Sequence, residues 1–365
     1  MPVEPQRMLG DLRALAELTG TELGAQRVAW TDTWAKAREW ERGLLAELPV
    51  TVEVDEAGNQ WATLEGDSPE TLIIGSHIDS VPDGGWLDGC LGVLSALEVL
   101  RGVAASGRPP ITVKLVDWAD EEGARFGQSL VGSAAAAGTL NPDDLRELRD
   151  AKGVSAAEAM AAHGVELDTM LNSRNRLEHA VSYIELHIEQ GPVLEARDLP
   201  LGVVTGTYGT ERWAVRFTGQ AAHSGSTPMD QRRDALLAAS RLALEVRELA
   251  RSRGGVGTVG RIAAAPGIPT AVAGVATMLV DQRHEEGDVL ADVRAEAERL
   301  SRSIAAEEKV EVEWSPLFRI APIPFDEHLI ESAAAIIEDL QGSDMRLPSG
   351  PLHDAARVAE AGVPT

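Results

Sequence analysis

Apolar strands that alternate with helical stretches constrain the fold of this chain more than any other feature. Residues 71–76 and 111–118 are predicted to be short buried strands, and residues 92–103 between them have the spacing of a helix. Helical spacing also covers residues 7–18 and 34–48. Strands that alternate with helices favour an α/β fold with a mostly parallel central sheet. In such sheets, functional side chains collect where the strands end.

The pattern changes between residues 211 and 316, where the predicted order is strand, helix, strand, strand, helix, strand. These six segments lie around residues 213–217, 230–251, 256–262, 275–280, 286–307 and 310–314. That order is the split pattern of a ferredoxin-like α+β unit. We therefore predict a small domain at 210–319, inserted into a discontinuous domain made of 1–209 and 320–365.

Charge and cysteine content exclude several classes of function. The net charge is −25, whereas nucleic-acid binding needs a basic face, so neither nucleic acid nor an anionic membrane is an expected partner. No apolar run is long enough to span a bilayer, and the N-terminus lacks the apolar centre of a signal peptide. Cys90 is the only cysteine, so no internal disulfide can form, and we expect a cytoplasmic protein.

Two candidate site segments follow the strand predicted at 71–76. His77 and Asp79 form an H-x-D pair, in which the carboxylate can accept the second ring N–H of a metal-bound imidazole. A polar loop after the strand explains that pair equally well. Asp88 lies in a glycine-rich turn just before a helix, where a carboxylate can bridge two cations or simply cap the helix. For Asp88 taken alone, the helix cap is favoured.

Four acidic residues gather at the end of the strand predicted at 111–118. Asp117, Asp120, Glu121 and Glu122 lie within six positions, and burying them is costly unless cations or hydrogen-bond donors compensate. Adjacent glutamates can divide two tasks, one binding metal and the other serving as a general base. The alternative is a solvated acidic turn.

Two further histidines complete the set. Alternation along residues 183–188 places His187 on the side opposite the apolar residues, where a ligand can be reached. His353 lies in a Gly/Pro-rich loop directly before Asp354. A half-buried strand and a plain helix start are the alternatives. Together, these histidines, Asp88 and the glutamate pair make a ligand set for two divalent cations, and the lack of thiolates favours Zn or Mn.

Five segments, in order, resemble the N-carbamoyl-L-amino-acid hydrolase and allantoate amidohydrolase family, whose members are related to zinc aminoacylases and carboxypeptidases. They are GSHIDSVPDGGWLDGCLGV, ADEEGARF, ELHIEQGPVLE, HSGSTPMDQRRDA and SGPLHDA, and the resemblance covers essentially the whole chain. ELHIEQGP is specific, because aminopeptidase-like relatives usually carry a carboxylate at the position of His187. The resemblance implies a metallopeptidase-like catalytic domain with an inserted lid and dimerisation domain.

The resemblance also implies a role for each metal-site residue. His77, Asp88 and His187 would hold the first metal ion, with Asp88 bridging to a second ion that Glu122 binds. Glu121 would be the general base that deprotonates the bridging water and later protonates the leaving nitrogen.

A second group of roles concerns orientation and substrate binding. Asp79 would orient His77, and Gln190 would lie close to the site. His223 of the inserted domain would reach the site of the partner subunit in a homodimer and stabilise the tetrahedral oxyanion. Arg283 would bind the substrate carboxylate, and His353 would lie in the substrate-site loop.

The chain departs from the family pattern in three places. Thr270 takes the place of a usual asparagine, and the loop 349–353 reads Ser-Gly-Pro-Leu-His where Ser-Gly-Ala-Gly-His is common. The sequence ends at Thr365, where the family continues with a buried strand and a histidine for the second metal site. If the chain is complete, we expect a weakened second metal site and lower stability.

These observations predict a metal-dependent amidohydrolase that cleaves the C–N bond of a ureido or N-carbamoyl acid, with two divalent ions per subunit. Three alternatives stay open. They are an allantoate amidohydrolase, an aminoacylase or dipeptidase relative, and an inactive homologue that only binds a ligand. Residues His163, His179, His284 and His328 are expected to be surface or structural, and Cys90 is expected to be a packed residue and not a nucleophile.

Overall fold

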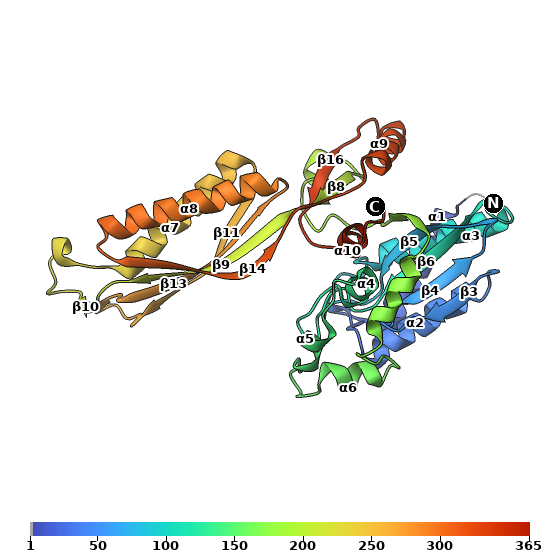
Figure 1. Ribbon diagram of the computed structural model, residues 1–365, viewed down its shortest axis with the longest axis horizontal. Helices are drawn as coiled ribbons and strands as arrows, with labels where there is room; N and C mark the ends of the chain where they lie inside the picture. The colour runs from blue at the N-terminus through green and yellow to red at the C-terminus, as the bar shows by residue number, and fades with distance from the viewer. Residues whose placement is uncertain (1–2) are drawn as a thin grey trace. The chain divides into compact units, whose positions relative to one another are not determined.

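The computed structural model describes residues 3–365, which form two compact units (Figure 1). Unit 1 comprises Met1–Val203, Phe325–Met345 and Leu352–Thr365, and unit 2 comprises Val204–Pro324 with Arg346–Pro351. The segment predicted as an inserted domain, 210–319, lies within unit 2. The short stretches that flank it, together with residues 346–351, were expected in the larger domain and belong to unit 2.

The central sheet of unit 1 has five strands in the order β3-β4-β6-β5-β7. Their bounds are Thr51–Val54, Gln60–Leu64, Ile111–Trp118, Ser68–His77 and Ala180–Ile184 in that order. Strand β5 runs parallel to β6 and β7, as the alternation predicted. Strands β3 and β4 pair antiparallel because a tight turn joins them directly. Strands β4 and β6 also pair antiparallel. The α/β fold is therefore confirmed, with a mixed sheet in place of a mostly parallel one.

Helices cover both faces of this sheet. On one face, α1 (Pro5–Thr19), α2 (Asp32–Leu45) and α3 (Cys90–Ala105) share a core with inward side chains of β4, β5 and β6. On the other face, α4 (Val131–Ala137) and α10 (Asp354–Glu360) pack on a second layer of sheet residues. Adjacent residues of β5 enter opposite layers, as expected for a strand buried on both faces. The remaining α-helices of unit 1 are α5 (Pro142–Arg146), α6 (Ala156–Ala161) and α9 (Glu327–Gln341), and two 3-10 helices span Met170–Leu177 and Glu195–Arg197.

Unit 2 contains the predicted strand, helix, strand, strand, helix, strand order. The elements are β9 (Gly209–Thr218), α7 (Ala235–Arg253), β11 (Val256–Ala265), β13 (Val275–His284), α8 (Gly287–Glu307) and β14 (Glu311–Ile320). The four strands form an antiparallel sheet in the order β11-β13-β9-β14, and α7 and α8 cover one face of it (Figure 1). Helix α7 begins later than predicted because the side chain of Asp234 caps it by accepting the N–H groups of Leu236 and Leu237.

Two small sheets complete unit 2. Strands β8 (Val203–Thr207), β15 (Ile323–Pro324) and β16 (Arg346–Ser349) associate in the order β15-β8-β16, which explains why residues 346–351 belong to this unit. Strands β10 (Ala222–His223) and β12 (Ala271–Val272) form an antiparallel pair.

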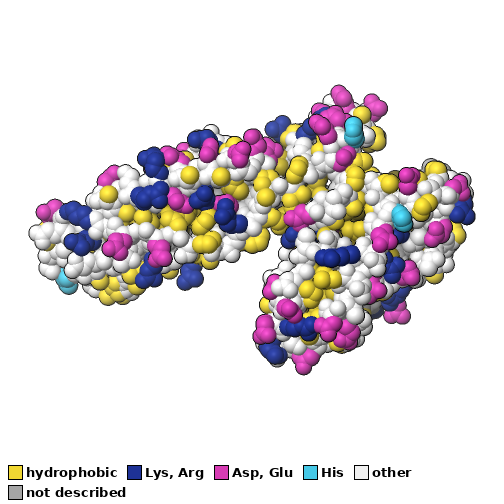
Figure 2. All heavy atoms as spheres, in the orientation of Figure 1, with side chains coloured by type: hydrophobic (Ala, Val, Ile, Leu, Met, Phe, Trp, Pro, Cys, Tyr) yellow, Lys and Arg dark blue, Asp and Glu magenta, His cyan; other side chains and the backbone are white. Residues whose placement is uncertain are grey.

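The surface carries charges of both signs. Asp and Glu side chains are spread over both units among Lys and Arg side chains (Figure 2). Among the described residues 3–365, no helix combines the length and the apolar character that crossing a bilayer requires.

Candidate metal centre and active site

Three side chains of unit 1 form a cluster of possible metal ligands. One ligand atom each from His77, Asp88 and His187 lies within 4.8 Å of the other two. His77 Nε2, Asp88 Oδ1 and His187 Nε2 are buried and lack any hydrogen-bond partner. Buried polar atoms without partners are rare, and three that face one another indicate a common missing partner.

The ring orientations suit a cation as that partner. His77 Nδ1 lies 3.1 Å from the carbonyl oxygen of Asp79, and His187 Nδ1 lies 2.9 Å from that of Ile188. Because a carbonyl oxygen can only accept, the N–H in each of these hydrogen bonds is assigned to Nδ1. In the neutral ring, this assignment leaves the Nε2 lone pair directed at the cluster. Two imidazole lone pairs and the carboxylate of Asp88 are a donor set that suits Zn or a similar divalent ion.

Local chain geometry brings His77 and Asp88 together. His77 is the last residue of β5, and Asp88 lies in the turn that leads into α3. Between Asp88 and α3, Gly89 has a φ of 63°. A Cβ atom at this position would lie 2.3 Å from the carbonyl oxygen and 2.5 Å from Nε2 of His77, so only glycine fits.

Asp79 acts on the backbone more than on the imidazole. Its carboxylate oxygen Oδ1 is 3.5 Å from His77 Nδ1, farther than its own carbonyl oxygen. The two carboxylate oxygens instead accept the backbone N–H groups of Glu121 and Glu122, each at 3.1 Å. Asp79 therefore joins the end of β5 to the turn after β6. Its contact with the His77 ring is made by the backbone carbonyl of Asp79 and not by the carboxylate that the sequence predicted.

Glu121 lies beside the cluster, and Glu122 lies outside it. The Oε2 atom of Glu121 is 3.6 Å from His77 Nε2, and burial raises the pKa of this carboxyl well above its usual range. The Glu122 side chain is partly buried, and burial raises its pKa as well. Among the described residues, no ligand atom of Glu122 lies within mutual reach of the three clustered atoms. Its role at a second metal ion therefore stays a prediction.

The other two acids of this turn are compensated by donors. Asp117 is 2.7 Å from Arg38 Nε and accepts the backbone N–H of Ile78 at 2.8 Å. Asp120 accepts the indole N–H of Trp30 at 2.6 Å. Burial raises the pKa of Asp117 to about 6 and that of Asp120 to about 8. A solvated acidic turn is therefore the wrong interpretation for these two residues.

The segment after β7 supplies His187 and Gln190. The alternation over residues 183–188 predicted that His187 lies within a strand. Strand β7 ends at Ile184, so His187 follows the strand and this prediction is wrong. Gln190 has a φ of 53° and donates from Nε2 to Asp88 Oδ2 at 2.9 Å. The other carboxylate oxygen of Asp88, Oδ1, lies 3.3 Å from His187 Nε2. Gln190 therefore holds one oxygen of Asp88 and leaves the other for the cluster.

His353 and Glu185 border the same cluster. The ring centroid of His353 is 3.9 Å from that of His187, and burial, followed by the charge of His187, lowers the pKa of His353 well below its usual value. Glu185, for which the sequence suggested no function, accepts hydrogen bonds from Ser76 Oγ at 2.7 Å and from the backbone N–H of Ala355 at 3.0 Å. Glu185 thereby fixes the start of α10 and the neighbouring His353.

Two predicted site residues belong to unit 2. His223 lies in β10 with an exposed side chain, and its Nδ1 accepts the backbone N–H of Gly225 at 3.2 Å. The backbone N–H of Ser224, the residue after His223, donates to the carbonyl of Thr270 at 3.0 Å. Arg283 in β13 donates from Nε to Asp281 at 2.8 Å and from Nη1 to the carbonyl oxygen of Gly350 at 2.9 Å.

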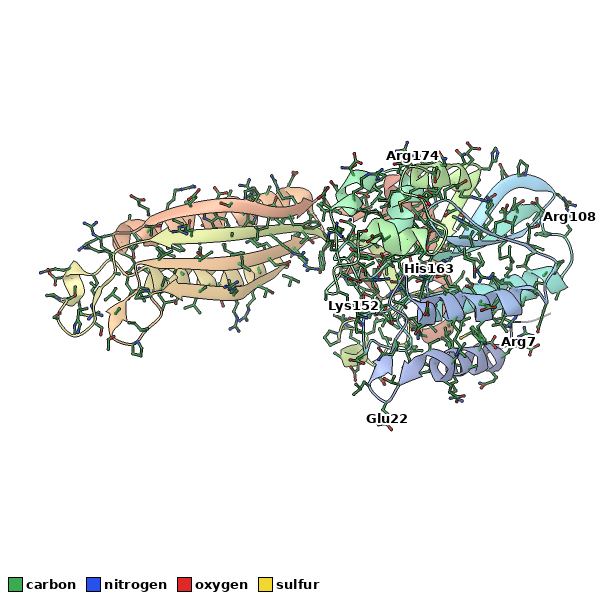
Figure 3. All side chains as sticks on the ribbon, turned by 90° about the horizontal axis from the view of Figure 1, so that it is seen from below. Arg7, Glu22, Arg108, Lys152, His163 and Arg174 are labelled. Carbon is green, nitrogen blue, oxygen red and sulfur yellow. The ribbon has the colours of Figure 1, made fainter. Side chains whose placement is uncertain are left out.

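Three residues expected to be structural have structural surroundings. His284 Nδ1 accepts the N–H of Glu286 at 2.9 Å, and its Nε2 is 3.0 Å from the carbonyl of Arg253. The ring of His163, labelled in Figure 3, packs edge-on against Trp34 with centroids 5.5 Å apart. Burial raises the pKa of Cys90 to about 11, which is unsuited to a nucleophile.

Comparison with known proteins agrees with this geometry. The sequence profile of peptidase family M20/M25/M40 matches residues 73–365. An N-carbamoyl-L-amino acid amidohydrolase of Geobacillus stearothermophilus is 37% identical over 344 residues, which cover 92% of this chain and 83% of the relative. An allantoate amidohydrolase of Escherichia coli (strain K12) is 34% identical and is matched over 94% of this chain and 84% of its own length.

A solved structure supports the same assignment. The crystal structure of a hydantoinase/carbamoylase family amidase from Burkholderia ambifaria superposes with a TM-score of 0.90 at 32% identity, covering 100% of this chain and 89% of that one. The matched profile covers well over half of the chain, and the relatives named above exceed 30% identity over most of it. The chain therefore belongs to peptidase family M20/M25/M40 and is similar to the hydantoinase/carbamoylase amidohydrolases within it.

Proposed function

We propose that this protein is a metal-dependent amidohydrolase that cleaves the C–N bond of an N-carbamoyl-L-amino acid or a closely related ureido acid. The observation that carries the proposal is the set of three orphaned ligand atoms of His77, Asp88 and His187 beside the buried carboxyl of Glu121. A pair of relatives named as N-carbamoyl-amino-acid and allantoate amidohydrolases supports the substrate class.

In this proposal His77, Asp88 and His187 hold one divalent ion, and Asp88 with Glu122 contributes to a second. Zn or Mn suits these nitrogen and oxygen ligands. When bound, such ions lower the pKa of water and polarise the carbonyl group of the substrate.

Glu121 moves the proton. Water adds to the ureido carbonyl carbon while Glu121 Oε2 accepts its proton, and the proton passes to the leaving nitrogen as the C–N bond breaks. The raised pKa of the buried Glu121 carboxyl suits both steps, because the same group must accept and then release a proton near neutral pH. Asp79, bonded to the backbone of Glu121, keeps the base in place.

Arg283 is proposed as the receptor for the substrate carboxylate. Asp281 accepts from Arg283 Nε and Nη2, and Gly350 accepts from Nη1, so three bonds hold the guanidinium plane. Planar guanidinium groups bind carboxylates bidentately. Gln190 and His353 are proposed to contact the substrate beside the metal ions. His223 is proposed to act in the partner subunit of a cytoplasmic homodimer. This proposal makes unit 2 a lid, and a monomer in sedimentation at micromolar concentration would count against the dimer.

Hydrolysis of a panel of substrates tests the proposal, with ammonia release measured for the ureido compounds and newly freed amino groups measured for the other substrates. The metal-stripped protein is incubated with N-carbamoyl-L-amino acids, allantoate, N-acetyl amino acids and dipeptides, with Zn or Mn restored. Turnover of the N-carbamoyl compounds that requires added metal supports the proposal, and preference for allantoate would move the assignment to that substrate. Turnover of only acetyl amino acids or dipeptides, or none by folded and metal-loaded protein, would contradict it.

A further inference from the structure

Arg27 is a fully buried cation behind the metal cluster. Its side chain is 0% exposed, so the charge is removed from water entirely. Nε donates to the carbonyl of Ile78 at 2.7 Å, Nη1 donates to Thr19 Oγ1 at 3.3 Å, and Nη2 has no partner. No ion pair joins Arg27 to a carboxylate of the described chain, residues 3–365. Burying an unpaired guanidinium is costly, so its bond to Ile78 calls for an explanation beyond packing.

The peptide of Ile78 is held from both sides. Its carbonyl accepts from Arg27 and, at 3.7 Å, from the thiol of Cys90, the first residue of α3. Its N–H donates to Asp117, whose other carboxylate oxygen lies 2.7 Å from Arg38 Nε. Ile78 is therefore fixed relative to α3, to the end of β6 and to the segment that carries Arg27.

A second contact extends this hold by two residues. The backbone N–H of Arg27 donates to Ser80 Oγ at 3.0 Å, and the N–H of Ser80 donates to the carbonyl of Arg27 at 3.1 Å. Arg27 thus binds residues 78 and 80, on either side of Asp79.

The held segment carries the parts that orient the metal ligands. Ile78 separates His77 from Asp79, whose carbonyl sets the ring of His77 and whose carboxylate binds the backbone of Glu121. A shift of the Ile78 peptide would move His77 Nε2 away from Asp88, which immediately precedes Gly89 and α3.

We propose that Arg27 is a positioning residue of the metal centre, because its guanidinium holds the carbonyl of Ile78 and its backbone holds Ser80. Arg27 itself touches neither metal nor substrate in this proposal. The inference rests on the metal centre proposed above. Groups that orient metal ligands from behind affect metal affinity about 10- to 100-fold when they are removed.

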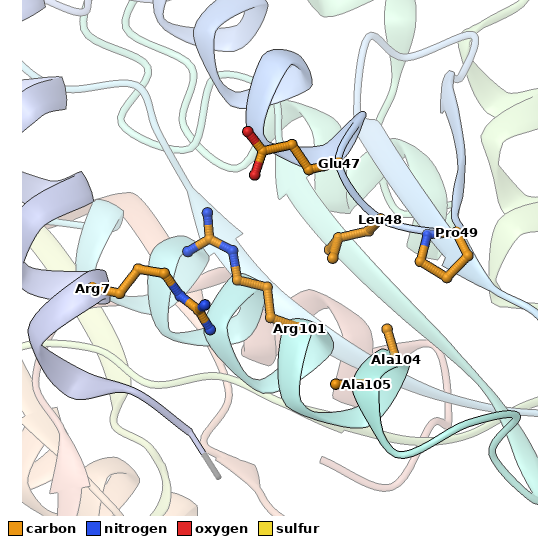
Figure 4. Close-up of a pocket in the computed structure, with 7 residues that line it drawn as sticks. All are labelled: Arg7, Glu47, Leu48, Pro49, Arg101, Ala104 and Ala105. Carbon is orange, nitrogen blue, oxygen red and sulfur yellow. The ribbon is translucent and has the colours of Figure 1, made fainter. Parts of the chain in front are cut away.

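Arg101 provides a matched control. It is also buried, at 9% exposure, but it is ion-paired with Asp11 and Glu98 at the far end of α3. Together with Arg7 and Glu47 it lines a separate pocket of about 290 Å³ (Figure 4). None of its hydrogen bonds reaches the segment 77–80.

The test compares Arg27→Met, Arg27→Lys and Arg101→Met with the parent chain by calorimetric titration of Zn or Mn into metal-free protein. Thermal unfolding of the metal-free proteins is measured in parallel. Arg27→Met is expected to weaken metal binding about 10- to 100-fold, whereas Arg101→Met destabilises the fold and leaves metal affinity unchanged. Arg27→Lys keeps a donor for Ile78 and should recover part of the affinity.

Two results would overturn the inference, and a third result would instead contradict the metal centre proposed above. If Arg27→Met binds metal as tightly as the parent and only lowers the unfolding temperature, Arg27 is structural. If that variant does not fold, Arg27→Lys, which keeps the charge and one donor, replaces it, and metal affinity equal to that of the parent in Arg27→Lys contradicts the inference. A parent chain that binds no metal would instead refute the proposed metal centre.

Discussion

The carboxylate of Asp79 accepts the backbone N–H of Glu121 at 3.1 Å, and this bond joins the ends of the two central strands β5 and β6. Asp79 is 0% exposed, so the bond is made without competition from water. It places the general-base candidate Glu121 beside the metal-ligand candidate His77, although the two residues are 44 positions apart in the sequence (121 − 77).

Replacing Asp79 by alanine should therefore affect both stability and metal binding. The buried N–H of Glu121 and the partly buried N–H of Glu122 would lose their acceptor, and the buried one alone costs about 1–3 kcal/mol. Urea unfolding and metal titration measure the two effects. Asp292→Ala, a change at an exposed aspartate of helix α8, is the control. Equal stability and metal affinity in the two variants would contradict this role of Asp79.

Gly89→Ala should abolish metal binding. The added Cβ would lie 2.5 Å from His77 Nε2, and the positive φ of 63° adds a backbone cost of about 1–2 kcal/mol. Gly107→Ala separates these effects, because Gly107 also has a positive φ, 101°, but no atom lies within 4 Å of its added Cβ. Metal affinity should fall in Gly89→Ala only. Similar metal affinity in both variants would show that the close approach to His77 is unimportant.

Glu41→Gln should stabilise the protein at alkaline pH. Glu41 is fully buried, and burial raises the pKa of its carboxyl to about 8, with the nearby charge of Asp117 contributing. Because the folded state holds this proton more tightly than the unfolded state, stability from this group is full below about pH 4.5 and is lost as the pH rises towards 8.

Urea unfolding at pH 6 and pH 8 measures this effect. The parent should lose more stability over that interval than Glu41→Gln does. Glu47→Gln, at an exposed glutamate just beyond the same helix, should behave like the parent. An identical pH dependence in all three proteins would refute the assignment.

Arg283→Lys should raise KM for carboxylate substrates. Loss of the planar fork removes charge-assisted hydrogen bonds worth about 1.5–3 kcal/mol, which corresponds to roughly 10- to 100-fold in KM. Arg216→Lys, at an exposed arginine of the neighbouring strand β9, is the matched control. Steady-state kinetics with a substrate and its carboxamide analogue decide the matter, because only the carboxylate form should lose affinity. Equal KM changes for both forms would mean that Arg283 does not bind the carboxylate.

Much of this fold could be predicted because the spacing of apolar residues shows which side of a strand or helix is buried. The strand at 111–118 and the split β-α-β-β-α-β order of unit 2 were both recovered from alternating and helical patterns. The antiparallel pairing of β3 and β4 was missed, since pairing direction depends on the length of the connecting turn and not on the strand pattern. The end of β7 at Ile184 was missed because alternation continues past the last paired residue.

The metal-ligand candidates could be predicted from the sequence, but the residues that position them could not. His77, Asp88 and His187 stand out as polar residues at strand ends and turns, and the structure brings them together. Arg27 and Glu185 gave no signal, because a single arginine or glutamate in a sequence carries no mark of burial. Their roles depend on contacts with Ile78 and Ala355, far away along the chain.

The central claim is tested most directly by comparing Glu121→Gln with the parent at equal metal content. Glu22→Gln, an exposed glutamate labelled in Figure 3, controls for the substitution itself. Ammonia release from the best N-carbamoyl substrate is measured after the metal content of each protein has been determined. The account predicts that turnover falls about 10²- to 10⁴-fold in Glu121→Gln, with the metal content of the parent retained and Glu22→Gln fully active. Parent-like turnover by metal-loaded Glu121→Gln would contradict it.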